Sequence, residues 1–280
     1  MNTHSDANYG RDFPDAVAAT LALVVPLFSG FSQVDGILIA GSFTAGTSDA
    51  RSDIDLYVYL NSELSVDERT AAVCKISSDF EIDNRFWETE DCFVVTDTGI
   101  KVELMYHGLD WMREQLERVL DRCEASVGFS TCFVHNYLSS RILFDRSGNF
   151  EALQRQYDRP YPEALRQAVL AKNLPLLKEC SSSYYNQIAL AVSREDWISV
   201  NHRTAALLAS YFDILFALNH QWHPGEKKLL RIALRDCSLL PVHFESDISE
   251  VLRHTTDTGI LAALDALIDR LKELTETGKY

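Results

Sequence analysis

Two aspartates at the start of an apolar run are the side chains of this sequence best placed to do chemistry. Asp53 and Asp55 open the stretch "DIDLYVYL", in which apolar residues recur at every second position from Ile54. Because successive side chains of a strand point to opposite faces, the spacing predicts a strand over 53–60 with both carboxylates on one face and a core on the other. Two carboxylates roughly 6 to 7 Å apart at their Cα atoms repel each other, and in a partly shielded site this repulsion requires a cation. Hard oxygen ligands suit Mg²⁺ or Mn²⁺.

A third carboxylate has the same setting further along the chain. The stretch "CFVVTDTGIKVELMYHG", residues 92–108, contains two alternating runs around an Asp-Thr-Gly turn, which predicts a β-hairpin. In its second strand Glu103 shares a face with Lys101 and Met105, and apolar residues occupy the other face. If this strand is a neighbour of the 53–60 strand, Glu103 joins the two aspartates at one metal site.

A glycine-serine pair precedes these carboxylates. The apolar run "GILIA", residues 36–40, predicts a buried strand that ends at Gly41 and Ser42. The loop that follows contains Thr44, Gly46, Thr47 and Ser48. Glycine lets the backbone approach a ligand closely, and exposed amides with hydroxyl groups beside them can hold phosphate oxygens.

This order of residues resembles the DNA polymerase β-like nucleotidyltransferase superfamily. The pattern is an apolar residue, Gly-Ser, a spacer of ten residues, Asp-apolar-Asp-apolar and a later acidic residue within a strand, and it extends over residues 36–106. The resemblance implies an α/β fold with a small mixed sheet and helices on one side. It also implies an enzyme that transfers a nucleotidyl group, here AMP from ATP, to an acceptor hydroxyl.

The same resemblance assigns roles to individual residues. Asp53, Asp55 and Glu103 would hold two Mg²⁺ ions, with Mn²⁺ as an alternative, and Glu103 would also help to deprotonate the acceptor. Gly41 and Ser42 would hold the triphosphate. Taken singly, an Asp-x-Asp is more often solvated surface and a Gly-Ser is more often a turn, so the prediction depends on their combination with Glu103.

Length and periodicity predict two domains. With 280 residues, 46% of them hydrophobic and 24% charged, the chain is globular and long enough for two cores. We expect an α/β nucleotidyltransferase domain over 1–150 and, because helical spacing dominates from residue 151, an all-α helical bundle over 151–280. Ser65 and Glu68 form a capping-box pattern that predicts a helix start. The uncharged stretch 16–34 contains Pro26 and polar residues, and we expect a buried helix rather than a membrane span.

Net charge and cysteine content indicate which partners and which cellular compartment to expect. A formal net charge of -15 repels nucleic acid and anionic lipid, so neither is an expected partner. Six cysteines occur without a CxxC pair, which favours reduced thiols in the cytoplasm over disulfides or a zinc site.

A second resemblance concerns the C-terminal half. The stretch "YFDILFALNHQWHPGEKKLL", residues 211–230, is similar to the helical domain of the nucleotidyltransferase-like proteins designated DUF4037 and, more distantly, of aminoglycoside and lincosamide nucleotidyltransferases. The His-Pro-Gly within it would end one helix and Glu226 would begin another, which places Lys227 and Lys228 in a first turn. Cations there oppose the helix dipole unless an anion is bound.

The two lysines are expected to point in different directions. Lys227 shares a helical stripe with Leu230 and Leu234, so it would point inward and contact the triphosphate, whereas Lys228 would face solvent. A pair of solvated surface lysines is the alternative.

Three functions are compatible with these residues. The first is a Mg²⁺-dependent nucleotidyltransferase that acts on a small hydroxylated acceptor, such as a cationic antibiotic. The second is a related enzyme that modifies a tRNA or a protein, and the third is a nucleotide-binding module without turnover. The sequence leaves the acceptor, the preferred nucleotide and the oligomeric state open.

Overall fold

The chain is organised as two units. The computed structural model describes residues 13–44, 52–86 and 88–277. Contacts among Cα atoms define an α/β unit, residues 1–115 and 136–158, and a helical unit, residues 116–135 and 159–280. The chain therefore passes between the units three times, in place of the single boundary expected after residue 150.

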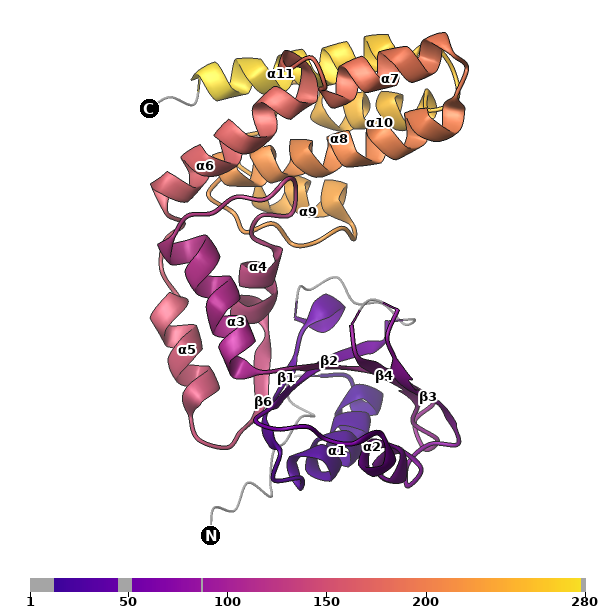
Figure 1. Ribbon diagram of the computed structural model, residues 1–280, viewed down its shortest axis with the longest axis vertical. Helices are drawn as coiled ribbons and strands as arrows, with labels where there is room; N and C mark the ends of the chain where they lie inside the picture. The colour runs from indigo at the N-terminus through magenta and orange to yellow at the C-terminus, as the bar shows by residue number, and fades with distance from the viewer. Residues whose placement is uncertain (1–12, 45–51, 87, 278–280) are drawn as a thin grey trace. The chain divides into compact units, whose positions relative to one another are not determined.

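A six-stranded mixed sheet forms the centre of the α/β unit, with the strand order β3-β4-β5-β2-β1-β6 (Figure 1). Only the β2–β5 pair is parallel, and the other neighbouring pairs are antiparallel. The strands are β1 (Val34–Ile39), β2 (Ile54–Leu60), β3 (Asp79–Asn84), β4 (Glu90–Val94), β5 (Lys101–His107) and β6 (Arg141–Asp145). The predicted hairpin corresponds to β4 and β5, and Asp53 lies immediately before β2 rather than within it.

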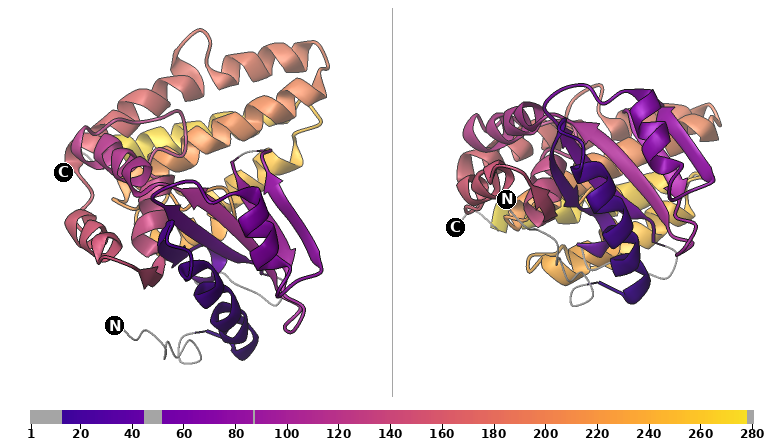
Figure 2. Two further views of the ribbon diagram at one scale, coloured as in Figure 1. Left: turned by 60° about the horizontal axis from the view of Figure 1, so that its bottom comes forward. Right: turned by 90° about the horizontal axis from the view of Figure 1, so that it is seen from below.

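Two helices cover one face of this sheet, α1 (Asp15–Ser29) and α2 (Val66–Val73) (Figures 1 and 2). The apolar side chains of β2 and β5 pack against them, and those of Ile54, Leu56, Val58, Val102 and Leu104 are completely buried. The predicted alternation is therefore confirmed for these residues. Helix α2 starts with the predicted capping box, in which the Ser65 hydroxyl accepts from the Glu68 amide and the Glu68 carboxylate accepts from the Ser65 amide.

The other face of the sheet is covered at one end of β2. Tyr59 is almost completely buried there, with ring centroids 6.4 Å from Tyr137 and 4.9 Å from Phe150. These partners belong to two of three further helices, α3 (Leu109–Leu116), α4 (Cys132–Ser139) and α5 (Asn149–Tyr157). Asp55, at the opposite end of the strand, keeps a partly exposed side chain.

A buried ion pair fixes which side chains of β4 face the core. Asp91 is fully buried and pairs with Arg69 of α2, and it also accepts hydrogen bonds from the Tyr106 hydroxyl at 2.7 Å and the Asp83 amide at 2.9 Å. Burial raises the pKa of Asp91, against the effect of these partners. Because Asp91 faces α2, its neighbours Glu90 and Cys92 face the opposite side of the sheet.

The described residues of the helical unit form helices and no strand. The core surrounds α8, whose Leu207, Tyr211, Ile214 and Leu215 are completely buried. The helices are α6 (Glu163–Leu174), α7 (Tyr184–Ser193), α8 (Trp197–Leu218), α9 (Leu229–Asp236), α10 (Phe244–Arg253) and α11 (Ile260–Thr277), with π-helical turns at Glu117–Asp121 and Pro175–Glu179.

A buried carboxylate explains why residues 116–135 belong to this unit. Asp213 of α8 accepts hydrogen bonds from the Ser130 amide at 3.0 Å, the Ser130 hydroxyl at 2.6 Å and the Asn173 amide group at 3.2 Å. Asn173 in turn accepts from the Gly128 amide at 3.0 Å. Burial raises the pKa of Asp213 to about 6. The segment that contains Gly128 and Ser130 is thus bonded to α6 and α8.

Candidate metal centre

The three carboxylates that the sequence singles out lie together at one end of the parallel strand pair. Asp55 and Glu103 are opposite each other in the register of β2 and β5. Asp53 precedes β2, and one oxygen from each of the three carboxylates lies within 4.8 Å of the other two. All three side chains are partly exposed, so a hydrated cation can reach them. The parallel register is what brings residues fifty positions apart in the sequence to one point.

The backbone of Gly41 packs directly against this cluster. Gly41 begins a single 3₁₀ turn after β1 with φ +69°, a conformation that side chains other than glycine's rarely adopt. A Cβ atom at this position would lie 2.9 Å from Cγ of Asp55 and closer still to its Oδ2. The Ala40 amide also donates to the carbonyl of Asp55 at 3.1 Å. Gly41 therefore leaves room for the Asp55 carboxylate, a role that sequence reasoning, which assigned it to the triphosphate, did not anticipate.

The loop after this turn lies mostly outside the described residues. Gly46, Thr47 and Ser48 belong to that part, as does the side chain of Ser42. Thr44 is described, and its hydroxyl donates to the Gly41 carbonyl at 3.2 Å. Phosphate binding by Gly41 and Ser42 stays a prediction.

Lys101 is a member of the cluster to which the sequence analysis gave no role. Its ammonium group forms an ion pair with Oε1 of Glu103, two residues along the same strand. The hydrogen bond to Glu103 raises the pKa of Lys101, and the charges of Glu103 and Asp53 act in the same direction. The sequence did indicate that this ion pair could form, since Lys101 and Glu103 share a face of the predicted strand. A lysine beside a glutamate is, however, common on exposed strands.

Cys92 and Glu90 of β4 approach Glu103 from its other side. Cys92 is opposite Glu103 in the β4–β5 register, and its thiol donates to Oε1 of Glu90 at 2.6 Å. Burial, followed by the hydrogen bond to Glu90, raises the pKa of Cys92 to about 12. The set formed by the three carboxylates contains only oxygen ligands, which suit a hard divalent cation such as Mg²⁺.

The structure corrects the expected position of Lys227. Helix α9 begins at Leu229 rather than at Glu226, because Gly225 and Lys228 both have positive φ values, +101° and +58°. Lys227 lies in the turn before the helix, and the side chains of Lys227 and Lys228 are both exposed. The helical-stripe argument that directed Lys227 inward is therefore wrong. Contact between Lys227 and a triphosphate stays a prediction without that support.

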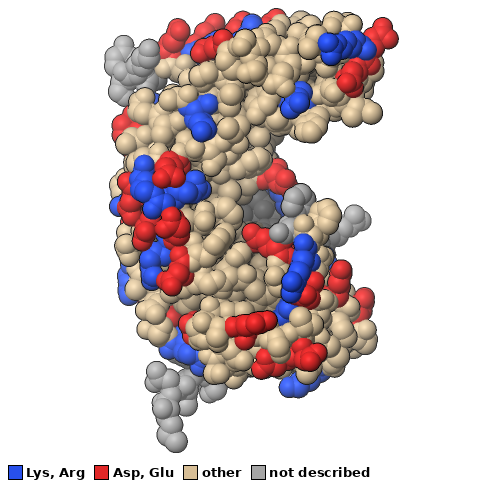
Figure 3. All heavy atoms as spheres, viewed as in Figure 1, with Lys and Arg blue, Asp and Glu red and all other residues tan. Residues whose placement is uncertain are grey.

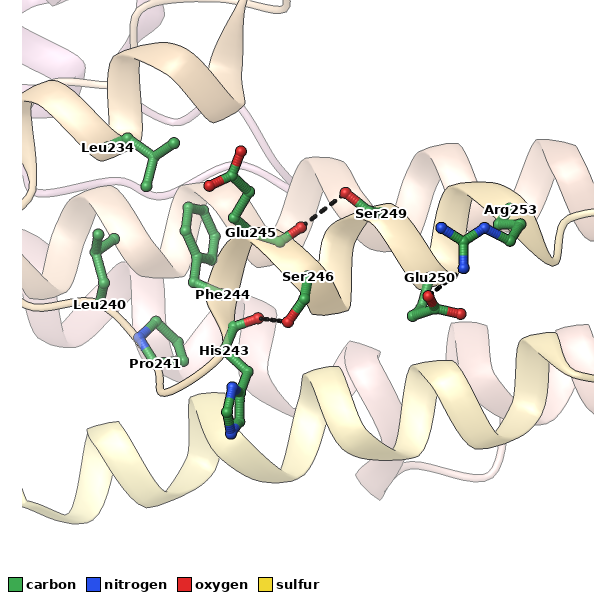
Figure 4. Close-up of a pocket in the computed structure, with 10 residues that line it drawn as sticks. All are labelled: Leu234, Leu240, Pro241, His243, Phe244, Glu245, Ser246, Ser249, Glu250 and Arg253. Carbon is green, nitrogen blue, oxygen red and sulfur yellow. Dashed lines mark hydrogen bonds and ion pairs between the residues drawn. The ribbon is translucent and has the colours of Figure 1, made fainter.

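A pocket of about 640 Å³ opens on the helical unit beside α10 (Figure 4). Its polar groups are largely bonded among themselves. The Ser246 hydroxyl donates to the His243 carbonyl and the Ser249 hydroxyl to the Glu245 carbonyl, each at 2.9 Å, and Arg253 pairs with Glu250 (Figure 4). The carboxylate cluster of the α/β unit is the stronger candidate for a site that binds a charged ligand.

Comparison with known proteins gives a family match in the second half of the chain. Residues 130–229, less than half of the sequence, match the family described as "Domain of unknown function (DUF4037)". The match includes almost all of the stretch 211–230, where the sequence resembles DUF4037. A crystal structure of a nucleotidyltransferase-like protein from Exiguobacterium sibiricum 255-15 is similar over 92% of this chain and 74% of its own, with 12% sequence identity and a TM-score of 0.42. The search of curated proteins finds no match.

Proposed function

We propose that this protein is a nucleotidyltransferase that uses divalent cations to transfer a nucleoside monophosphate to a hydroxyl group. The observation that carries the proposal is the convergence of Asp53, Asp55 and Glu103, whose carboxylate oxygens lie within 4.8 Å of one another. The close approach of Gly41 to Asp55 supports it, because the backbone leaves the space that this carboxylate needs. If the three acids were only a solvated surface patch, a side chain at residue 41 would not be expected to collide with one of them.

The three carboxylates would hold two Mg²⁺ ions, with Mn²⁺ as an alternative. Bound there, the ions supply neutralisation of charge on the triphosphate and on the leaving pyrophosphate. Asp55 and Glu103 lie on two paired strands, which hold their backbones in fixed positions, and Asp53 directly precedes the first of these strands. Gly41 and Ser42 would present the turn after β1 to the phosphates.

The proposed reaction is an in-line displacement. The acceptor oxygen forms a bond to the α-phosphorus, the bond from that phosphorus to the bridging oxygen breaks, and pyrophosphate leaves with the electron pair. The proton of the acceptor hydroxyl passes to the Glu103 carboxylate, which lies on the partly exposed face of β5. We propose ATP as the donor and AMP as the group transferred.

A small hydroxylated molecule is the proposed acceptor. A net charge of -15 disfavours nucleic acid and suits a cationic acceptor, an aminoglycoside-like compound for example. On the face drawn in Figure 3, acidic and basic side chains are interspersed rather than gathered into one basic surface. We propose a cytoplasmic location, since all six cysteines are free thiols. No helix among the described residues is long and apolar enough to cross a membrane.

The direct test is release of pyrophosphate from each of the four nucleoside triphosphates, with Mg²⁺ and a panel of hydroxylated acceptors that includes cationic sugars, bulk tRNA and a protein extract. Transfer of an α-labelled nucleotide to a small acceptor, absent in Asp55→Asn, is the expected result. Label on tRNA or protein would favour the macromolecule-modifying alternative. Binding of a nonhydrolysable triphosphate with no transfer to any acceptor would favour a nucleotide-binding module.

A further inference from the structure

The carboxylate cluster contains a cation supplied by the chain itself. Lys101 forms an ion pair with Oε1 of Glu103, one of the three acids through which the proposed function would bind metal. Close carboxylates repel one another unless a positive charge is near, and Lys101 supplies one such charge.

The geometry of Lys101 allows it to leave this position. Lys101 and Glu103 occupy the same face of β5, and the side chains are 50% and 22% exposed. A half-exposed lysine on a flexible four-carbon stem loses little when its ammonium group turns into water. The backbone of β5 is held on both sides by β2 and β4, so withdrawal of the lysine requires no movement of the strand.

We propose that Lys101 is a positioning residue: it is the resident counter-ion of Glu103 in the metal-free protein, and a divalent cation displaces it. This inference depends on the proposed function, because it concerns the same carboxylates. Three carboxylates and one ammonium group carry a net charge of -2, and replacement of the ammonium group by one divalent cation reduces this charge to -1. In the absence of nucleotide Lys101 thus limits the affinity of the cluster for metal, and it holds Glu103 in place until metal arrives.

Substitution of Lys101 should change metal affinity in the opposite direction to substitution of a residue that merely supports the site. Removal of the lysine charge should tighten metal binding, because one repulsive charge near the cation is lost. Two unit charges 4 Å apart interact by about 1 kcal/mol even in bulk water, which is about fivefold in affinity. The same substitution should lower the melting temperature of the metal-free protein, since the carboxylates lose a counter-ion.

The test is a titration of the full-length protein with Mn²⁺, without nucleotide, in which free Mn²⁺ is measured by electron paramagnetic resonance. Lys101→Met should bind Mn²⁺ about fivefold more tightly than the wild type, or tighter still. Lys101→Arg keeps the charge and should bind like the wild type. Lys75→Met is the matched control, because Lys75 is an exposed lysine in the turn that follows α2, on the side of the sheet away from Glu103.

The outcomes separate this inference from the proposed function. If the wild-type protein binds no Mn²⁺ at millimolar concentrations, the metal centre itself is wrong. If the wild type binds and Lys101→Met binds equally or less tightly, the counter-ion role is overturned while the metal centre stands. Lys101→Gln, checked by circular dichroism, provides a second neutral variant should Lys101→Met fold poorly, and it must show the same tightening.

Discussion

The carboxylate of Asp55 occupies the space that a side chain on Gly41 would need. A Cβ atom there would come within 2.9 Å of Cγ of Asp55, and the backbone of Gly41 has a φ of +69°. Two separate requirements for glycine thus coincide at one residue. The first is conformational and would apply in any tight turn. The second is specific to the carboxylate cluster, and it can be separated from the first by experiment.

Gly41→Ala should reduce kcat/KM by roughly 10² or more, because displacement of a catalytic group by about 1 Å has an effect of that size. Gly99→Ala is the matched control: Gly99 has the same φ of +69°, but a Cβ there meets nothing within 4 Å. Both variants should lose about 1–2 kcal/mol of unfolding free energy from backbone strain. Equal activities in the two variants would show that Gly41 serves only the turn.

Asp53→Asn and Asp55→Asn should each abolish turnover and Mn²⁺ binding without destabilising the metal-free protein. Loss of one of three close negative charges relieves repulsion, so the melting temperature without metal should stay the same or rise slightly. Asp97→Asn, in the exposed β4–β5 turn, controls for a general effect of charge. A clear fall in the metal-free melting temperature would mean that the aspartates are structural.

Glu103→Gln keeps the volume of the side chain but removes its charge and basicity. If Glu103 binds metal or accepts the proton of the acceptor, kcat should fall by roughly 10² or more, and triphosphate affinity should change far less. Glu90→Gln is the matched comparison, since Glu90 reaches Glu103 through the second cluster with Cys92 but is no part of the aspartate cluster. A larger loss of kcat in Glu90→Gln than in Glu103→Gln would indicate that the metal centre lies nearer to β4.

Lys227→Ala should weaken binding of a nonhydrolysable triphosphate by roughly ten- to a hundredfold if Lys227 contacts a phosphate, as expected for loss of a charge-assisted hydrogen bond. Lys228→Ala removes the same charge from the adjacent residue and should have little effect. Because both side chains are exposed, a general electrostatic effect would appear equally in both variants. Equal losses, measured by calorimetric titration with Mg²⁺, would rule out a specific contact through Lys227.

A buried histidine predicts how the stability of the helical unit depends on pH. His223 is fully buried, its Nδ1 accepts from the Gly225 amide at 3.1 Å, and its Nε2 has no hydrogen-bond partner among the described residues. The rings of Phe129 and Phe216 lie against it, with centroids 4.9 and 5.2 Å away. Burial, assisted by repulsion from His135, lowers the pKa of His223 from 6.5 to about 3.

Because the folded pKa of His223 is lowered, acid protonates this histidine first in the unfolded chain. Its contribution to stability is complete above pH 6.5 and is lost as the pH falls toward 3, with a limiting slope of about 1.4 kcal/mol per pH unit. Asp213 acts in the opposite sense, since its raised pKa of about 6 favours the folded state as the pH falls below 6.

A comparison of variants isolates the contribution of the histidine. His223→Asn, whose Oδ1 can accept from Gly225 as Nδ1 does, should be less stable at pH 7 but should lose less stability between pH 6.5 and 4.5 than the wild type. Urea unfolding at a series of pH values measures both slopes. Parallel curves would show that His223 becomes protonated in the folded protein as readily as in the unfolded one.

The strands and the carboxylate cluster were predictable because their signals are local and periodic. Alternation in "DIDLYVYL" identifies the buried face of β2, where Ile54 and Leu56 are completely buried. The turn chemistry of Asp-Thr-Gly identifies the β4–β5 hairpin. The meeting of Asp55 with Glu103 required one further assumption, that the two strands are neighbours, and the parallel pairing of β2 with β5 confirms it.

The remaining features depend on conformations and distances that the sequence does not contain. The sequence analysis misplaced Lys227 because α9 begins only after Lys228, which has a positive φ. A lysine does not by its residue type indicate that conformation. The relation of Gly41 to Asp55 and the ion pair of Lys101 with Glu103 arise only when separate backbone segments and side chains are placed in space. Hydrophobic periodicity indicates which face of a strand or helix a residue occupies, but not which other residues it contacts.

The three passages of the chain between its units bear on the order in which it can fold during synthesis. Residues 116–135 leave the ribosome before α6 and α8, although Gly128 is bonded to Asn173 of α6 and Ser130 to Asp213 of α8. The partners of this segment are therefore synthesised only after β6, which completes the sheet of the other unit, and after α5. A fragment that begins at residue 159 would bury the Asp213 carboxylate without Ser130, and one that ends at residue 115 would lack an edge strand of its sheet. Neither unit of this protein can be produced by a single cut.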